Sequence, residues 1–420
     1  KSSIAYNTGL GLLMTVLYVF MSYSISSTLG LEYYFFLISA PQIILYYLSR
    51  ALEGISAGAS PQHIGFSLIM FEATKIISAI YLIIMAKQAL IGAIIAVIIA
   101  QFFKTIYLVV ALFPIIRISK VEKEHLVRFT KLAWIPLYCE LAYYIGHADI
   151  YVVAYLSQSM MSIAYVKAAS TLAAVMLYTA SFSQALYPRI LAKNTGKDIE
   201  ETLRLALMFL IPMSIGVITM AKPLLCIFGT KYLHAYLALV VLTVGFSASS
   251  LNKIFESVIL GVEKVDLNKK ASFKNYLHSS LFILPTVRYI VNGVYLLVLA
   301  LLIATKTLDT VTAWCLTQTV ARVIFTLWGY WYSKKLIQYS FLSRNMINYL
   351  LSALAMITVL KIARADQIVE ISVRALLPKL TLWVFVGGIV YFITLLTIDK
   401  YSRKLAKALF SKTIRLLPSK

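Results

Sequence analysis

The chain has 420 residues, of which 60% are hydrophobic and 13% are charged, and it carries a formal net charge of +22 at pH 7. A water-soluble domain of this composition would expose too much apolar surface, so the composition excludes an ordinary soluble protein. The charge would otherwise suggest nucleic acid as a partner, but the basic residues lie between apolar stretches, which argues against that class.

Twelve apolar stretches follow one another along the chain. Each is long enough to cross a hydrocarbon core of about 30 Å as a helix, which takes roughly 20 residues. A membrane β-barrel would show alternating segments of about ten residues instead. We therefore predict an all-α, polytopic membrane protein with twelve transmembrane helices. The stretches lie at 4–26, 31–56, 64–86, 90–115, 126–156, 160–190, 203–228, 233–261, 271–304, 309–335, 345–364 and 376–398.

Basic residues are concentrated at the N-terminus, on the even-numbered connections and in the C-terminal tail. By the positive-inside rule, this pattern predicts a multi-pass protein of the plasma membrane with both termini in the cytoplasm. The tail is suited to anionic lipid headgroups, which makes membrane lipids an expected partner. Its basic residues are Lys400, Arg403, Lys404, Lys407, Lys412, Arg415 and Lys420.

Prolines inside the stretches predict bent helices, because each removes a backbone hydrogen bond. They are Pro41, Pro136, Pro212 and Pro285. In the ninth stretch we expect Pro285 to separate a basic interfacial start, containing Lys269, Lys270 and Lys274, from the part that crosses the membrane. The chain has no Cys and His spacing typical of a metal site, so we expect neither a metal nor a cofactor.

The order and spacing of several residues resemble the polysaccharide-biosynthesis, O-antigen type of flippase. This family belongs to the multidrug/oligosaccharidyl-lipid/polysaccharide exporter superfamily. The resemblance runs over roughly 126–265 and continues loosely elsewhere. The residues that carry it are Asp149, Tyr165, Ala168, Pro188, Pro212, the Gly229, Tyr232 and Ala235 group, and Leu260–Gly261 before a basic loop.

The resemblance implies a fold of two six-helix lobes followed by two further helices. It makes the fifth stretch the seventh family helix, so that this chain holds helices three to fourteen and the first hairpin is expected upstream of residue 1. Residues 1–119 would then be a partial N-terminal lobe of four helices. Residues 120–338 would form the C-terminal six-helix lobe, and 339–420 two additional helices with the basic tail.

The function that the resemblance implies is transport without covalent catalysis, so the protein is not expected to be an enzyme. The substrate would be an oligosaccharide linked to a polyprenyl or dolichyl (pyro)phosphate, moved from the cytoplasmic to the outer face by alternating access. An H⁺ or Na⁺ coupling ion and glycan-assembly enzymes are further partners that this function would admit. A cation-coupled multidrug exporter of the same superfamily is the main alternative. A membrane glycosyltransferase using polyprenyl-phosphate sugars is a third, against which the short outer loops argue.

Charged side chains inside the stretches are the candidate site residues, because a charge in hydrocarbon needs a partner or a wet cleft. Glu72 with Lys75, and Lys253 with Glu256, are i,i+3 pairs that we expect to neutralise each other. Lys104 is a further candidate cation for the substrate, and Glu72 is also a candidate for ion coupling.

The fifth stretch carries a polar stripe at helical spacing. Its members are Glu140, Tyr143, Tyr144, His147 and Tyr151. The stripe indicates either a cleft, with Glu140, Tyr144 and His147 binding substrate, or a face packed on neighbouring helices with each polar tip satisfied. Glu140 is also a candidate for ion coupling.

Asp149 and Lys167 each lie nine residues from Gln158 on adjacent antiparallel helices, and so at one depth. Asp149 is a candidate for ion coupling and Lys167 for substrate binding, with a mutual salt bridge as the alternative for both. Arg288 and Arg322 also share a depth, with no acidic residue nearby in their own stretches. We predict that they bind the phosphate of the substrate, since guanidinium recognises phosphate in a bidentate manner. The alternative is that each pairs with a carboxylate on another helix.

Overall fold

The structure is a computed structural model that describes residues 1–29, 32–186, 190, 196–263, 265, 273–341, 343–370 and 372–407. Its compact units are Lys1–Pro136 and Leu137–Lys420. Pro188, Lys269, Lys270 and the tail beyond Lys407 lie outside the described residues. Within those residues every regular element is a helix, which confirms the predicted all-α class.

The first unit is a group of antiparallel helices in which α3 packs between α1 and α5, and α4 packs on α5. Its core contains Leu52, Leu108 and Leu112, all fully buried. Pro41 occupies the first position of α3, where its missing N–H costs no intrahelical bond, so the chain bends there without loss. The elements are α1 (Ser2–Leu29), α2 (Tyr33–Ser39), α3 (Pro41–Ala59), α4 (Gln62–Ala79), the π-helical η1 (Ile80–Met85), α5 (Ala89–Ile118) and α6 (Lys123–Leu132).

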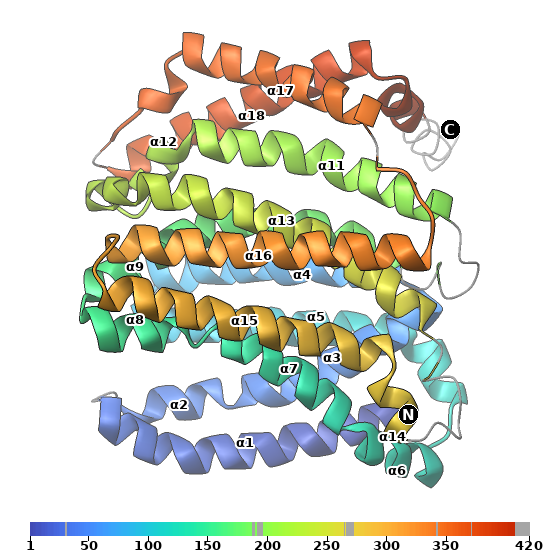
Figure 1. Ribbon diagram of the computed structural model, residues 1–420. Helices are drawn as coiled ribbons and strands as arrows, with labels where there is room; N and C mark the ends of the chain where they lie inside the picture. The colour runs from blue at the N-terminus through green and yellow to red at the C-terminus, as the bar shows by residue number, and fades with distance from the viewer. Residues whose placement is uncertain are drawn as a thin grey trace, which may run out of the picture. The chain divides into compact units, whose positions relative to one another are not determined.

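The second unit is larger and is built around α13, which packs against α16, α11 and α9 (Figure 1). A separate pair, α17 and α18, packs on α11. The elements are α7 (Trp134–Gly146), α8 (Asp149–Ser157), α9 (Met160–Ala173), η2 (Ala174–Ala185), α11 (Gly196–Thr219), α12 (Ala221–Cys226), η3 (Thr230–Ala235), α13 (Tyr236–Val262), α14 (Phe273–Leu277), α15 (Ser280–Ala304), α16 (Thr310–Leu336), α17 (Ser343–Ile362), η5 (Ala365–Gln367) and α18 (Val373–Ile398).

All twelve predicted stretches carry helix, and within the described residues ten helical segments are long and apolar enough to cross a membrane. The fifth stretch is divided into α6, α7 and α8. The tenth forms α16, a continuous helix of 27 residues that contains Gln318, Arg322, Lys334 and Lys335 and is therefore less apolar than the others. The count of twelve crossings stays a prediction.

The expected break at Pro285 is wrong, because this residue lies inside α15. The chain turns earlier, at His278 and Ser279, between α14 and α15. The carboxylate of Glu263 accepts a hydrogen bond of 2.7 Å from the backbone N–H of Ser280 and so satisfies one of the free donors at the start of α15. This contact, from a residue 17 positions earlier, stabilises the start of α15 at Ser280.

Two glycines allow α13 and α16 to approach closely. A Cβ on Gly245 would lie 2.8 Å from Oγ1 and 3.1 Å from Cα of Thr319, and one on Gly329 would lie 2.5 Å from Oδ1 of Asn252. Small residues permit such close helix contacts inside membranes, where lipid competes with any looser packing.

We expect Gly245→Ala to lower the free energy of unfolding by about 1–3 kcal/mol, because the added methyl group must push α16 away. Gly293→Ala is the matched control, since a Cβ on this exposed glycine of α15 meets no atom within 4 Å. The control should raise stability by up to about 1 kcal/mol through helix propensity. Melting temperatures in detergent test both, and equal shifts for the two variants would contradict the close packing of α13 on α16.

Candidate functional site

A break in the helix creates the first polar feature of the second unit. The helix α7 ends at Gly146, and α8 begins with Asp149 as its first residue. A Cβ on Gly146 would lie 2.7 Å from Nδ2 of Asn292, which donates to the carbonyl of Ala142 at 2.8 Å. The Asn292 side chain thus occupies the space that a Cβ at position 146 would need. The break leaves Asp149 at a helix start, where the helix dipole favours an anion.

Asp149 is 1% exposed, and its carboxylate is held by neutral donors alone. Its Oδ2 accepts hydrogen bonds from the Tyr295 hydroxyl at 2.8 Å, Trp314 Nε1 at 2.8 Å and Gln318 Nε2 at 3.1 Å. Its Oδ1 accepts the N–H of Ile150 at 2.8 Å. Among the described residues no ion pair joins it to a basic side chain, so the carboxylate is buried with hydrogen bonds but without a counterion.

The predicted alternative of a salt bridge between Asp149 and Lys167 is not present among the described ion pairs, and Lys167 is exposed on α9. Sequence analysis missed the three partners Tyr295, Trp314 and Gln318. The last two are one helical turn apart on α16, and Arg322 follows after another turn. The spacing of Trp314, Gln318 and Arg322 along one face of an otherwise apolar helix was the feature of the sequence that could have indicated these partners.

Arg322 extends that row and lies beside an aromatic ring. Its guanidinium carbon is 3.7 Å from the centre of the Phe246 ring on α13. One of its Nη atoms is buried without a hydrogen-bond partner, and no described carboxylate forms an ion pair with it. The cation–π contact compensates part of the charge, but this hydrogen-bonding nitrogen remains available for an anion.

Arg288 is in a different situation, because it forms an ion pair with Glu256 of α13. The same carboxylate accepts from Nδ2 of Asn252 at 2.8 Å and from Lys253 at 3.2 Å, which confirms the predicted Lys253–Glu256 pair. The guanidinium of Arg288 also lies 5.2 Å from the Phe325 ring centre. Arg288 therefore pairs with a carboxylate on another helix, which was the alternative to phosphate binding, and this ion pair neutralises its charge.

The polar stripe of the fifth stretch lies on an exposed face of α7 and α8. Tyr143, Tyr144 and Tyr151 are 51%, 64% and 77% exposed, and Glu140 and His147 are exposed too. The Tyr143 and His147 rings make an edge contact with centres 4.5 Å apart. The packed alternative, in which neighbouring helices satisfy each polar tip, does not describe this face.

The first unit pairs its intramembrane charges. Lys104 forms an ion pair of 2.6 Å with Glu53, which also binds Arg50 at 3.1 Å. Glu72 and Lys75 form the predicted pair at 2.5 Å. Lys104 is therefore neutralised by a carboxylate of α3 that sequence spacing did not reveal.

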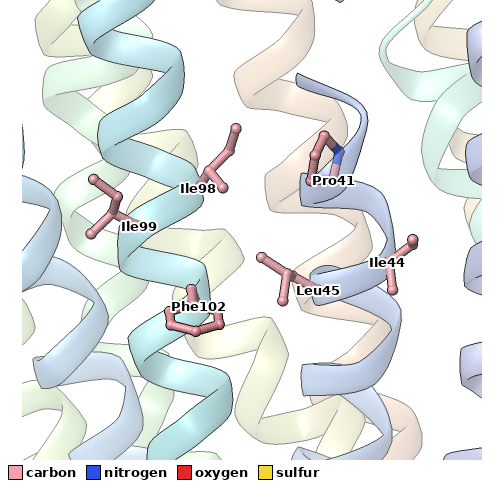
Figure 2. A pocket seen from close by; sticks show the side chains of 6 residues that line it. All are labelled: Pro41, Ile44, Leu45, Ile98, Ile99 and Phe102. Carbon is pink, nitrogen blue, oxygen red and sulfur yellow. The ribbon is translucent and has the colours of Figure 1, made fainter. Parts of the chain in front are cut away.

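An apolar groove lies between α3 and α5, as Figure 2 shows. Its cavity of about 410 Å³ is lined by hydrocarbon side chains on both helices: Pro41, Ile44, Leu45, Ile98, Ile99 and Phe102. The lining suits a hydrocarbon chain and offers nothing to hold a charged headgroup. In the described part of the chain, no group of three or more His, Cys, Asp and Glu side chains is arranged to hold a metal ion.

No family model matches the chain, and no curated protein matches it significantly. Among solved structures, the chain is similar to the lipid II flippase MurJ in an inward closed conformation. The TM-score is 0.59 and the identity 16%, over 96% of this chain and 84% of that one. It is also similar to the MATE transporter VcmN of Vibrio cholerae in the bent form, with a TM-score of 0.58 and 15% identity over 79% and 77% of the two chains. At these identities the similarity shows a shared polytopic helical fold.

We expect Arg288→Gln to lower stability strongly, because it leaves Glu256 largely buried and short of its main cation. Removing one partner of a buried pair costs about 3–5 kcal/mol, and the remaining contact with Lys253 places the expected loss near the lower figure. The double variant Glu256→Gln with Arg288→Gln should recover much of the melting temperature in detergent. Lys253→Gln, at a half-exposed position, serves as the control and should change little. A wild-type melting temperature for Arg288→Gln would refute a structural role for the pair.

Proposed function

We propose that the chain is a flippase of the multidrug/oligosaccharidyl-lipid/polysaccharide exporter superfamily. Its substrate would be an oligosaccharide on a polyprenyl or dolichyl (pyro)phosphate, moved from the cytoplasmic to the outer face by alternating access. The fold shared with a lipid II flippase over nearly the whole chain supports the class of transporter. The observation that carries the substrate class is the unpaired guanidinium of Arg322.

A guanidinium within apolar helices is costly unless an anion or a polar environment compensates it. The other candidate cations within the predicted stretches differ from Arg322, since Lys167 is exposed and the rest have carboxylate partners: Lys75, Lys104, Lys253 and Arg288. Arg322 alone among these described candidates combines a buried free nitrogen with the lack of an ion pair. A phosphate or diphosphate group supplies the charge and the acceptors that this nitrogen lacks.

Asp149 is the residue that we propose for ion coupling. Its hydrogen-bond donors are neutral and it forms no ion pair among the described residues, so a proton or Na⁺ would find a carboxylate without a salt-bridge partner. Gln318, which donates to Asp149, is one turn from Arg322 on the same helix. A change in the charge of Asp149 would therefore act directly on the proposed phosphate ligand.

A cation-coupled multidrug exporter is the second candidate. The similarity to VcmN has a TM-score almost equal to that for MurJ. The same buried carboxylate, without a basic partner among the described residues, would suit a lipophilic cation. The sign of the charge that the site prefers distinguishes the two functions.

We expect undecaprenyl diphosphate to raise the melting temperature of the purified protein in detergent, and neutral undecaprenol to leave it unchanged. Arg322→Gln should weaken this binding at least tenfold, as expected for loss of a hydrogen bond to a charged group. Its melting temperature without ligand should equal or exceed that of wild type, because an unpaired buried charge has been removed. Arg322→Lys keeps the charge but loses the planar guanidinium, so it should bind undecaprenyl diphosphate more weakly than wild type and more tightly than Arg322→Gln.

Undiminished binding of undecaprenyl diphosphate by Arg322→Gln would reject the phosphate role. Stabilisation of wild type by a lipophilic cation such as tetraphenylphosphonium, lost in Asp149→Asn, would favour the drug exporter. The two arms use the same protein and the same measurement, so the outcomes are directly comparable.

We also propose that both termini lie in the cytoplasm of a cell whose plasma membrane holds the protein. In the second unit the turns between α8 and α9 and between α15 and α16 lie at one end, and α18 ends at the other (Figure 1). The basic residues of 400–407 belong to the latter end, as the positive-inside rule requires of the cytoplasmic side.

Single cysteines at Gln158 and Thr307 should react with an impermeant maleimide in intact cells, whereas one at Lys404 should react only after the membrane is opened. The background replaces Cys139, Cys226 and Cys315. Labelling of Lys404 in intact cells would reverse the proposed topology.

A further inference from the structure

Three buried polar atoms without hydrogen-bond partners gather at the end of the second unit where α11 begins. They are Nε of Arg204 and the hydroxyl oxygens of Tyr349 and Tyr401. Tyr349 is fully buried at 0% exposure. Buried polar side-chain atoms almost always have a partner, so three orphans in one place indicate a missing one.

The contacts of α11 explain why Arg204 and Tyr401 meet. Met208, one turn after Arg204, accepts a hydrogen bond of 2.9 Å from Tyr391 through its carbonyl. Its sulfur lies 3.6 Å from the hydroxyl oxygen of Ser402. Arg204 therefore faces the chain that follows α18, and its guanidinium carbon lies 5.4 Å from the ring centre of Tyr401.

The start of α17 brings the second tyrosine to the same place. Asn345 and Asn348 donate to Oδ1 of Asp399 at 3.0 and 3.1 Å, which ties α17 to the end of α18. Tyr349 is the next residue along α17, and Asp399, Tyr401 and Arg204 are polar neighbours of its hydroxyl. The helices α11 and α17 and the segment that follows α18 thus bring one guanidinium and two hydroxyls to a common region.

The carboxylates of Asp399 and Glu200 are not the missing partner. Asp399 already accepts at Oδ2 from the N–H and the hydroxyl of Ser402, at 2.8 and 2.7 Å, besides the two asparagines. Burial raises the pKa of Asp399, but these hydrogen bonds lower it below its ordinary value, so the group is ionised at neutral pH. Glu200 is likewise held, by the N–H and hydroxyl of Ser340 at 2.9 and 2.7 Å.

We propose that Arg204, Tyr349 and Tyr401 form a binding site for a phosphate group, and that the headgroup of an anionic membrane lipid is its source. One guanidinium N–H and two O–H donors match an acceptor with several oxygens and a negative charge. The apolar spans of α17 and α18 are bounded here by Asn345 and Ile398, so the site lies at the level of headgroups.

Exposed basic residues surround the site and would attract anionic lipid to it. They are Lys400, Arg403, Lys404 and Lys407. Such a lipid would link α17 and α18 to α11. This site shares no residue with the one proposed at Arg322. The inference goes beyond the proposed transport function and does not depend on the identity of the transported substrate.

The test measures binding of dioctanoylphosphatidylglycerol to the full chain in detergent, by native mass spectrometry and by thermal shift. The comparison ligands are dioctanoylglycerol, which has no phosphate, and inorganic phosphate. Tyr349→Phe and Tyr401→Phe should each weaken lipid binding about tenfold, and Arg204→Gln by more, in line with the loss of hydrogen bonds to a charged group. Arg374→Gln removes an exposed basic charge at the opposite end of α18 and is the control, with an expected change under about threefold. Arg322→Gln should bind the lipid as wild type does.

Without lipid, Tyr349→Phe should melt at or above the wild-type temperature, because it removes an unpaired buried hydroxyl. Saturation by inorganic phosphate with the same dependence on the variants would uphold the phosphate site and assign it to the free ion. Equal binding of phosphatidylglycerol to wild type and to all three variants would overturn the proposal, as would equal binding of dioctanoylglycerol. A marked loss of melting temperature in lipid-free Tyr349→Phe would also count against it, since the hydroxyl would then have an internal partner.

Discussion

The constraint on which the structure depends is that hydrocarbon provides no hydrogen bonds, so that polar groups must find partners within the protein. The backbone meets this constraint by forming helix throughout the described spans. Side-chain charges meet it by pairing between helices: Glu53 of α3 with Lys104 of α5, and Glu256 of α13 with Arg288 of α15. Each pair links segments that are distant in sequence, so satisfying a charge also specifies which helices lie together. The pairs are thus parts of the scaffold as well as solutions to a solvation problem.

Two buried charged side chains, Asp149 and Arg322, have no ion-pair partner among the described residues, and these two are the informative ones. Arg322 retains a free buried nitrogen, and Asp149 carries its charge among neutral donors. Gln318 donates to Asp149 and lies one turn from Arg322 on α16, so it connects the two groups. A protein whose internal charges were all paired would have little reason to bind an ion or an anionic headgroup at its centre. The two groups have opposite charges, Asp149 on α8 and Arg322 on α16, and we propose that this arrangement couples the binding of an ion to that of an anionic substrate.

Close packing positions these groups. The glycines of α13 and α16 let the two backbones approach, and Trp314 can then reach Asp149 from the buried face of α16. The break between α7 and α8 makes Asp149 the first residue of a helix, where the helix dipole favours its negative charge. At the other end of the second unit, Asp399 joins α17 to α18 through Asn345 and Asn348. Small residues and capping interactions, more than apolar area alone, decide the contacts here, because lipid is as apolar as the helix surfaces.

The sequence by itself determined the class of protein, the helical content and the local pairs Glu72–Lys75 and Lys253–Glu256, because hydropathy and i,i+3 spacing are properties of neighbouring residues. It also singled out Arg288, Arg322 and Asp149 as residues that needed an explanation. Only the tertiary structure decided the explanations, giving Arg288 the carboxylate of Glu256 while leaving Arg322 without one. It replaced the expected Lys167 partner of Asp149 by Tyr295, Trp314 and Gln318, and moved the break at Pro285 to the cap provided by Glu263. The partner of a charge is set by which helices pack together, and packing depends on shape and close contact between segments far apart in the chain, which no spacing along one helix encodes.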